Sequence, residues 1–61
     1  MYVDVGDLVE YQYDGIINIG IVIQKMDDTH TMQKHQVWVL WDDGIIERSH
    51  ARFLKVISEG R

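Results

Sequence analysis

The sequence predicts a single all-β domain of five strands, with a short 3₁₀ turn before the last strand. Two observations support this fold class. Short apolar runs alternate with polar residues at the two-residue period of a strand, and glycines at positions 6, 15, 20, 44 and 60 separate these runs as turns. A length of 61 residues is sufficient for one domain, so residues 1–61 are expected to fold as a single unit.

The apolar runs place the elements in chain order. The expected strands cover residues 7–13, 16–25, 36–41, 45–48 and 54–57. Asp14-Gly15 forms a turn between the first two strands, and Gly20 marks a bend or bulge within the second. Residues 26–36 have no sustained apolar period and are expected to form a loop. Ser49 is expected to cap the 3₁₀ turn at residues 50–53.

The third expected strand is apolar on both faces, which is unusual in so small a domain. Alternation places Trp41 on the core face and Trp38 on the opposite, peripheral face. Asp43-Gly44 is expected to supply two residues of positive φ for a tight hairpin. The predicted core consists of Val5, Val9, Tyr11, Val22, Val39, Trp41, Leu54 and Val56.

Antiparallel pairing of the second and third strands predicts an outward apolar patch. Its four side chains are Ile21, Ile23, Trp38 and Leu40. Ile21 is expected near Leu40, and Ile23 near Trp38. A contiguous patch of this kind usually marks an interface. The alternative is that the loop, the N-terminal residues or the C-terminal tail covers the patch within one subunit.

The small size of the chain favours self-association through this patch. A domain of 61 residues buries only about 60% of its unfolded surface, and the sequence contains no cysteine that could form a disulfide. Oligomerisation is then the remaining means of stabilisation. We therefore expect a homo-oligomer, with a symmetric dimer as the default geometry.

Charge and hydropathy limit the remaining partners. The net charge of −4 argues against binding led by nucleic-acid phosphates. The alternative interpretation, a nucleic-acid-associated accessory factor, uses Arg48, Arg52 and Lys55, with base stacking by Tyr13. No run approaches the roughly 20 apolar residues of a membrane span. The lack of cysteine and of a signal-peptide pattern predicts a complete cytoplasmic reading frame.

Candidate catalytic and metal-binding residues have simpler interpretations. The paired carboxylates Asp42 and Asp43 are typical of a turn, and Ser49-His50 lacks an orienting acid. A third interpretation, a metal-binding or small-molecule-binding accessory to an enzyme, rests on His30 and His35 near Asp27 and Asp28, without a known ligand spacing. We therefore predict that the protein is not an enzyme and requires no metal or cofactor.

Four segments in order carry a resemblance to a known fold family. They are Val5-Gly6-Asp7-Leu8-Val9, Gly20-Ile21-Val22, Val39-Leu40-Trp41-Asp42-Asp43-Gly44 and Phe53-Leu54-Lys55-Val56-Ile57. Over residues 5–57 the chain resembles SH3-like small barrels of the Tudor and KOW type. The small size and the initial Met also resemble bacteriophage proteins that carry this barrel, which implies a location in the host cytoplasm.

The resemblance implies a five-stranded SH3-like barrel and two types of ligand. Tudor domains recognise methylated Lys or Arg in a cage of aromatic rings. Tyr13 matches one cage position, and Asn18 and Asp43 occupy the others. KOW domains often bind RNA or the ribosome through basic loops, whereas the loops here are acidic. The favoured interpretation is a non-catalytic module that binds a protein partner or itself through the outward patch.

Overall fold

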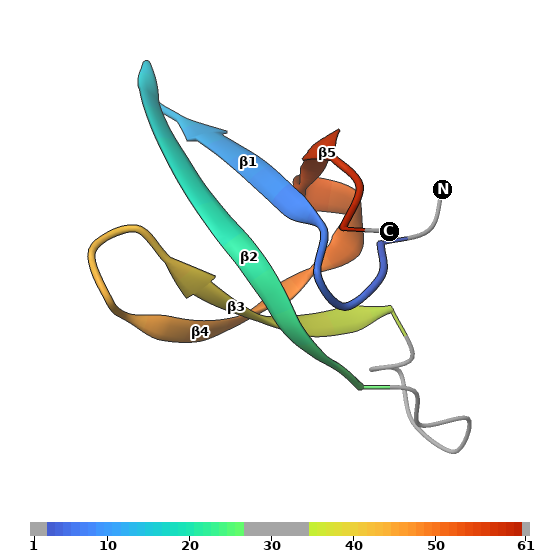
Figure 1. Ribbon diagram of the computed structural model, residues 1–61. Coiled ribbons are helices and arrows are strands. Elements are labelled where there is room, and N and C mark those ends of the chain that lie inside the picture. The colour runs from blue at the N-terminus through green and yellow to red at the C-terminus, as the bar shows by residue number, and fades with distance from the viewer. Residues whose placement is uncertain (1–2, 27–34, 61) are drawn as a thin grey trace.

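The computed structural model describes residues 3–26 and 35–60, which form one five-stranded antiparallel sheet (Figure 1). The strands are β1 (Leu8–Tyr13), β2 (Ile16–Met26), β3 (Gln36–Trp41), β4 (Ile46–His50) and β5 (Lys55–Ser58), and their order in the sheet is β4-β3-β2-β1-β5. The all-β prediction is confirmed, and each predicted strand lies within two residues of its observed bounds. The predicted loop falls largely on residues 27–34, which lie outside the described residues.

Two hairpin turns set the pairing of neighbouring strands. Asp14 and Gly15 both have positive φ, at 53° and 79°, as a two-residue type I′ turn requires. The second hairpin differs from the prediction, because Gly44 has a positive φ of 87° and Asp43 does not. Its loop has three residues, 42–44. The Gly44 amide donates to the Trp41 carbonyl, and the Trp41 amide donates to the Ile45 carbonyl. Such a loop needs the left-handed conformation only at its last residue.

The buried core is small and mostly valine. Among the described residues, six hydrophobic side chains are buried: Val3, Val9, Val22, Val37, Val39 and Leu54. Tyr11, Trp41 and Val56, predicted as core, are partly buried and pack against these side chains. The prediction for Val5 is wrong, since this side chain is 53% exposed and Val3 is buried instead. Val5 lies in the turn before β1, where the alternation of the strand does not apply.

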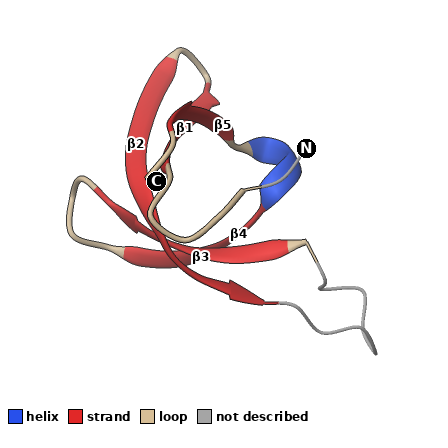
Figure 2. Ribbon diagram, turned by 45° about the vertical axis from the view of Figure 1, so that its right-hand side comes forward, coloured by secondary structure: helices blue, strands red, loops and turns tan. Residues whose placement is uncertain are grey.

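The sheet is strongly curved, and it is open. Figure 2 shows β1 and β5 across from β3 and β4, with the 3₁₀ turn η1 (Ala51–Phe53) joining β4 to β5. Pairings link β5 to β1 and β4 to β3, and within the described residues no pairing links β4 to β5. The cap of η1 is His50 rather than Ser49, because the His50 Nδ1 atom accepts the Arg52 amide at 3.1 Å.

Two irregularities of β2 have separate causes. The register shifts between Val22 and Gln24, so that Ile23 is the extra residue of a β-bulge. Gly20 was predicted to be the bend or bulge, but it pairs regularly with Val9 and Trp41. Its lack of a side chain serves close packing instead. A Cβ atom at this position would lie 2.5 Å from Val39 Cγ1 and 2.8 Å from Trp41 Cε3.

A buried carboxylate ties both ends of the described chain to the sheet. Asp7 is 1% exposed, and its two carboxylate oxygens accept the backbone amides of Asp4 at 2.9 Å and of Gly60 at 3.1 Å. The Asp7 carbonyl also accepts the Val22 amide. Gly60 lies directly on the backbone of Gly6, where a Cβ atom would have no room. A charge so deeply buried is tolerated because these amides replace its water.

The described residues contain no helix long enough or apolar enough to cross a membrane. The helical element among them is the three-residue η1.

Replacing Asp7 with Asn should destabilise the domain by about 1 to 3 kcal/mol, because one buried backbone amide loses its acceptor and faces an NH₂ group instead. Urea unfolding followed by tryptophan fluorescence measures the loss. Asp42→Asn is the matched control, since it removes the same charge from an exposed turn. An equal loss in the two variants would show that the Asp7 contacts are not a structural anchor.

Candidate functional site

The outer face of the sheet carries a row of aliphatic side chains that crosses four strands. Leu8 pairs with Ile21, Ile21 with Leu40, and Leu40 with Ile46. Cross-strand partners share a face, so these four residues, here named the aliphatic row, point to the same side. The side chains of Leu8, Leu40 and Ile46 are exposed, and that of Ile21 is half-buried. The predicted proximity of Ile21 and Leu40 is confirmed.

The rest of the predicted patch differs in register. Trp38 lies opposite Gln24 rather than Ile23, because the bulge inserts Ile23 as an extra residue. Trp38 and Trp41 occupy opposite faces as predicted, although both are half-buried. The bulge therefore changes the partner of Trp38 but leaves it on the same face as the aliphatic row.

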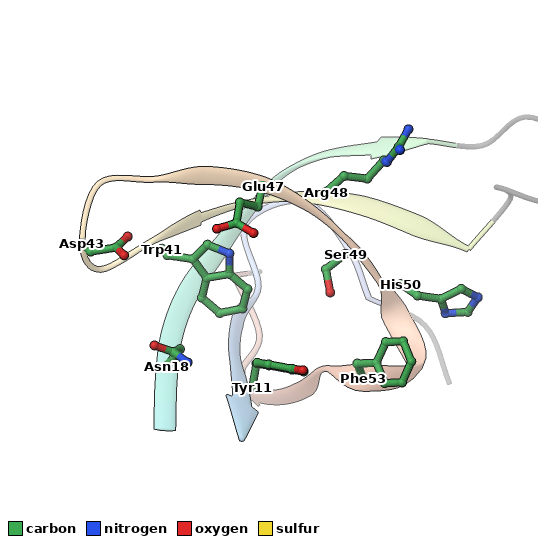
Figure 3. Close-up of a pocket in the computed structure, with 9 residues that line it drawn as sticks. All are labelled: Tyr11, Asn18, Trp41, Asp43, Glu47, Arg48, Ser49, His50 and Phe53. Carbon is green, nitrogen blue, oxygen red and sulfur yellow. The ribbon is translucent and has the colours of Figure 1, made fainter. Parts of the chain in front are cut away.

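The inner face of the sheet holds a pocket of about 400 Å³, here named the aromatic pocket (Figure 3). It is lined by Tyr11, Asn18, Trp41, Asp43, Glu47, Arg48, Ser49, His50 and Phe53. These residues come from β1, β2, β3, the hairpin after β3, β4 and η1. The pocket thus extends the valine core toward solvent, with Tyr11 and Trp41 in contact with both.

Aromatic rings flank the aromatic pocket on two sides. On one side the Tyr11 and Trp41 rings lie 6.4 Å apart at 57°. Tyr13 stacks behind Tyr11 at 6.5 Å and 5°. On the other side Phe53 lies 6.1 Å from His50, with its ring nearly perpendicular. Figure 3 shows Trp41 above Tyr11, with Phe53 on the other side of the pocket, near His50.

Strand β4 supplies the polar side of the aromatic pocket. Glu47 pairs with buried Val39, and Ser49 with buried Val37, so both side chains point to the inner face. Figure 3 shows the Glu47 carboxylate above the Trp41 ring, whereas the Arg48 side chain extends away from the rings. Within the described part of the chain, Glu47 forms no ion pair. Its negative charge is therefore available to a ligand.

This combination of groups suits a cation. The faces of Tyr, Trp and Phe rings attract positive charge, and a nearby carboxylate adds Coulombic attraction. Ser49 and His50 do not form a nucleophile and base pair here. They lie on opposite faces of β4, and the His50 Nδ1 atom already accepts a backbone amide. Ser49 and His50 therefore do not supply a nucleophile and its base at the aromatic pocket.

The other sequence candidates are only partly brought together. His35 lies 6.0 Å from His50, while His30, Asp27 and Asp28 fall outside the described residues. No group of three His, Asp or Glu side chains gathers among residues 3–26 and 35–60 as a metal site would require.

The three candidate cations for nucleic-acid binding lie on different elements and have different neighbours. Arg48 is on β4, Arg52 lies 4.9 Å from the centre of the Phe53 ring, and Lys55 on β5 pairs with Glu10. Arg52 is thus engaged by an aromatic ring and Lys55 lies opposite an acid. These three cations therefore do not form the continuous basic stripe that would bind nucleic-acid phosphates.

Sequence reasoning missed the aromatic pocket because it assigned Tyr11 and Trp41 to the core. The signal that could have found it is the alternation in β4, which places Glu47 on the same face as the core strands. Asn18 and Asp43, which the resemblance to Tudor domains assigns to cage positions, line the aromatic pocket. Tyr13 does not line this pocket and is 68% exposed, whereas Tyr11 does line it.

Comparison with known proteins finds no matching family model, no matching curated protein and no matching solved structure.

Replacing Gly20 with Ala should disturb the aromatic pocket from beneath. The added Cβ atom meets the Trp41 ring, the Val39 side chain and the Leu40 carbonyl oxygen, and overpacking of this kind costs about 1 to 3 kcal/mol. We expect lower stability and a shifted Trp41 indole resonance in NMR spectra, with the Trp38 resonance little changed. Asn18→Ala on the same strand is the control for stability. An unmoved Trp41 resonance would contradict the role assigned to Gly20.

Proposed function

We propose that this chain is a non-catalytic protein-interaction module with an SH3-like barrel fold, whose aromatic pocket accepts a cationic side chain of a partner protein. The observation that carries the proposal is the Glu47 carboxylate above a pocket walled by Tyr11, Trp41 and Phe53. The protein partner, the cytoplasmic location and the origin among bacteriophage-like barrels are parts of the proposal that rest on the sequence alone.

The fold part of the proposal is supported by topology. Five antiparallel strands, the curvature of the sheet and a 3₁₀ turn between β4 and β5 are the features expected of an SH3-like barrel. Closure would bring the edges formed by β4 and β5 together. The resemblance to Tudor domains implies a ligand of the methylated lysine or arginine class. Asn18 and Asp43, which the resemblance assigns to cage positions, line the aromatic pocket without supplying rings.

The ligand class is supported by charge as well as by the rings. Glu47 and Asp43 border the aromatic pocket, and the Arg48 head extends away from it. The net charge of −4 also favours approach of a basic segment. A pocket of about 400 Å³ falls within the usual size of small-ligand sites, about 300 to 1,000 Å³, and so has room for one long side chain.

Peptides that differ at one position test the cation requirement. We expect a trimethyllysine peptide to bind more tightly than its norleucine counterpart by about 2- to 30-fold, since a cation on aromatic faces contributes about 0.5 to 2 kcal/mol. An unmodified lysine peptide should fall between them, because an ammonium group is more strongly hydrated. NMR titration of the two tryptophan indole resonances measures the affinities.

Variants locate that binding. Phe53→Leu and Glu47→Gln should each weaken trimethyllysine binding, whereas Glu59→Gln, which removes an exposed acid outside the aromatic pocket, should not. Equal affinity for the trimethyllysine and norleucine peptides would show an apolar groove without cation recognition. No response of the Trp41 resonance to any peptide would contradict the proposal.

Nucleic-acid binding should be weak, with a dissociation constant no tighter than the ~10⁻⁴ to 10⁻⁶ M of non-specific contacts at physiological salt. The acidic turns and the scattered cations are the physical reason. A salt titration with labelled RNA and DNA measures it. Submicromolar binding that Arg48→Glu with Arg52→Glu abolishes would favour the alternative function, a nucleic-acid-associated factor.

A further inference from the structure

The aliphatic row leaves one face of the sheet without a partner in the described structure. Its four residues pair directly from strand to strand, so the row is continuous over β1, β2, β3 and β4. Ile19 lies two residues from Ile21 on β2, and Trp38 two residues from Leu40 on β3, so both flank the row on the same face. We infer that a second copy of this chain docks on this face through the aliphatic row, related by a twofold axis.

The size of the face fits that partner. Leu8, Ile19, Leu40 and Ile46 are between 36% and 53% exposed, so together they present on the order of 300 Å² of surface, at the scale of a functional patch. The molecule measures 34 × 28 × 22 Å. One face of such a body is comparable to the about 800 Å² per partner that a standard interface buries.

Charge distinguishes this face from the rest of the surface. Among the described residues, Asp14, Asp42 and Asp43 are in turns, and Glu47 is on the inner face. Around the aliphatic row, Glu10, Lys55 and Arg48 are placed on the outer face by register, one acid among two bases. Each copy carries a net charge of −4, so two copies would repel one another if they met at their acidic turns. A contact through the outer face instead brings acidic and basic side chains together.

Because the hydrophobic core is small, binding of a second copy would stabilise the folded chain. The buried hydrophobic side chains among the described residues are five valines and one leucine. The single core of so small a domain rarely supplies more than about 3 to 5 kcal/mol, and the chain contains no cysteine that could add a disulfide. Burying the aliphatic row in a twofold interface extends the apolar contact to the other side of the same sheet.

Sedimentation of the full chain from about 5 to 500 μM tests the inference, with the range set by the micromolar affinities of small interfaces. We expect a dimer that Leu40→Glu dissociates, with its dissociation constant raised at least about 100-fold, as charge at the centre of an interface requires. Ile46→Lys, on edge strand β4, is the second variant and is the less disturbing to the fold. Ile45→Lys, at a similarly exposed isoleucine outside the row, is the control and should remain dimeric.

A cross-link provides an independent measurement. Because the chain has no native cysteine, Leu40→Cys introduces a single thiol at the centre of the row. Oxidation or a short bismaleimide should then give a covalent dimer, and Ile45→Cys should give far less. A wild-type chain that is monomeric at hundreds of micromolar overturns the inference, as does a dimer that Leu40→Glu and Ile46→Lys leave intact. The peptide titrations of the aromatic pocket do not depend on this result, since that pocket lies on the other face.

Discussion

The register between β2 and β3 is the constraint on which the rest of the structure depends. Val22 opposite Val39 buries both side chains at the centre of the core. The same register places the adjacent residues Ile21 and Leu40 opposite each other on the outer face, and Gly20 opposite Trp41 on the inner face. Because side chains alternate along a strand, a slip of one residue would exchange the two faces. Core, outer face and aromatic pocket therefore have one common origin.

The buried Asp7 carboxylate complements this register. A core of six aliphatic side chains leaves little margin, and Val3 is its one member in the segment before β1, so further contacts order the segments before β1 and after β5. Asp7 joins them by accepting the amides of Asp4 and Gly60, which are 56 residues apart in the chain, while its carbonyl accepts the Val22 amide of β2. One residue thus links both terminal segments to the strand at the centre of the sheet.

The two proposed surfaces are compatible because they use opposite faces of one sheet. The inner face is rich in aromatic rings and carries Glu47, which suits a charged ligand. The outer face is aliphatic with mixed charges at its border, which suits an apolar contact between like subunits. Association through the outer face would leave the aromatic pocket open, and would place two such pockets on opposite sides of a dimer.

Local patterns in the sequence were sufficient to place the strands, the Asp14-Gly15 turn and the opposite faces of Trp38 and Trp41. These features depend on alternation and on the backbone freedom of a few residues, which act over short distances. Tertiary structure decided the remainder. The bulge at Ile23 arises only where β2 pairs with β3. Gly20 is required because the Trp41 ring on the neighbouring strand leaves no room for a Cβ atom. The exchange of Val5 for Val3 and the aromatic pocket itself depend on how the curved sheet encloses its interior, which no local pattern encodes.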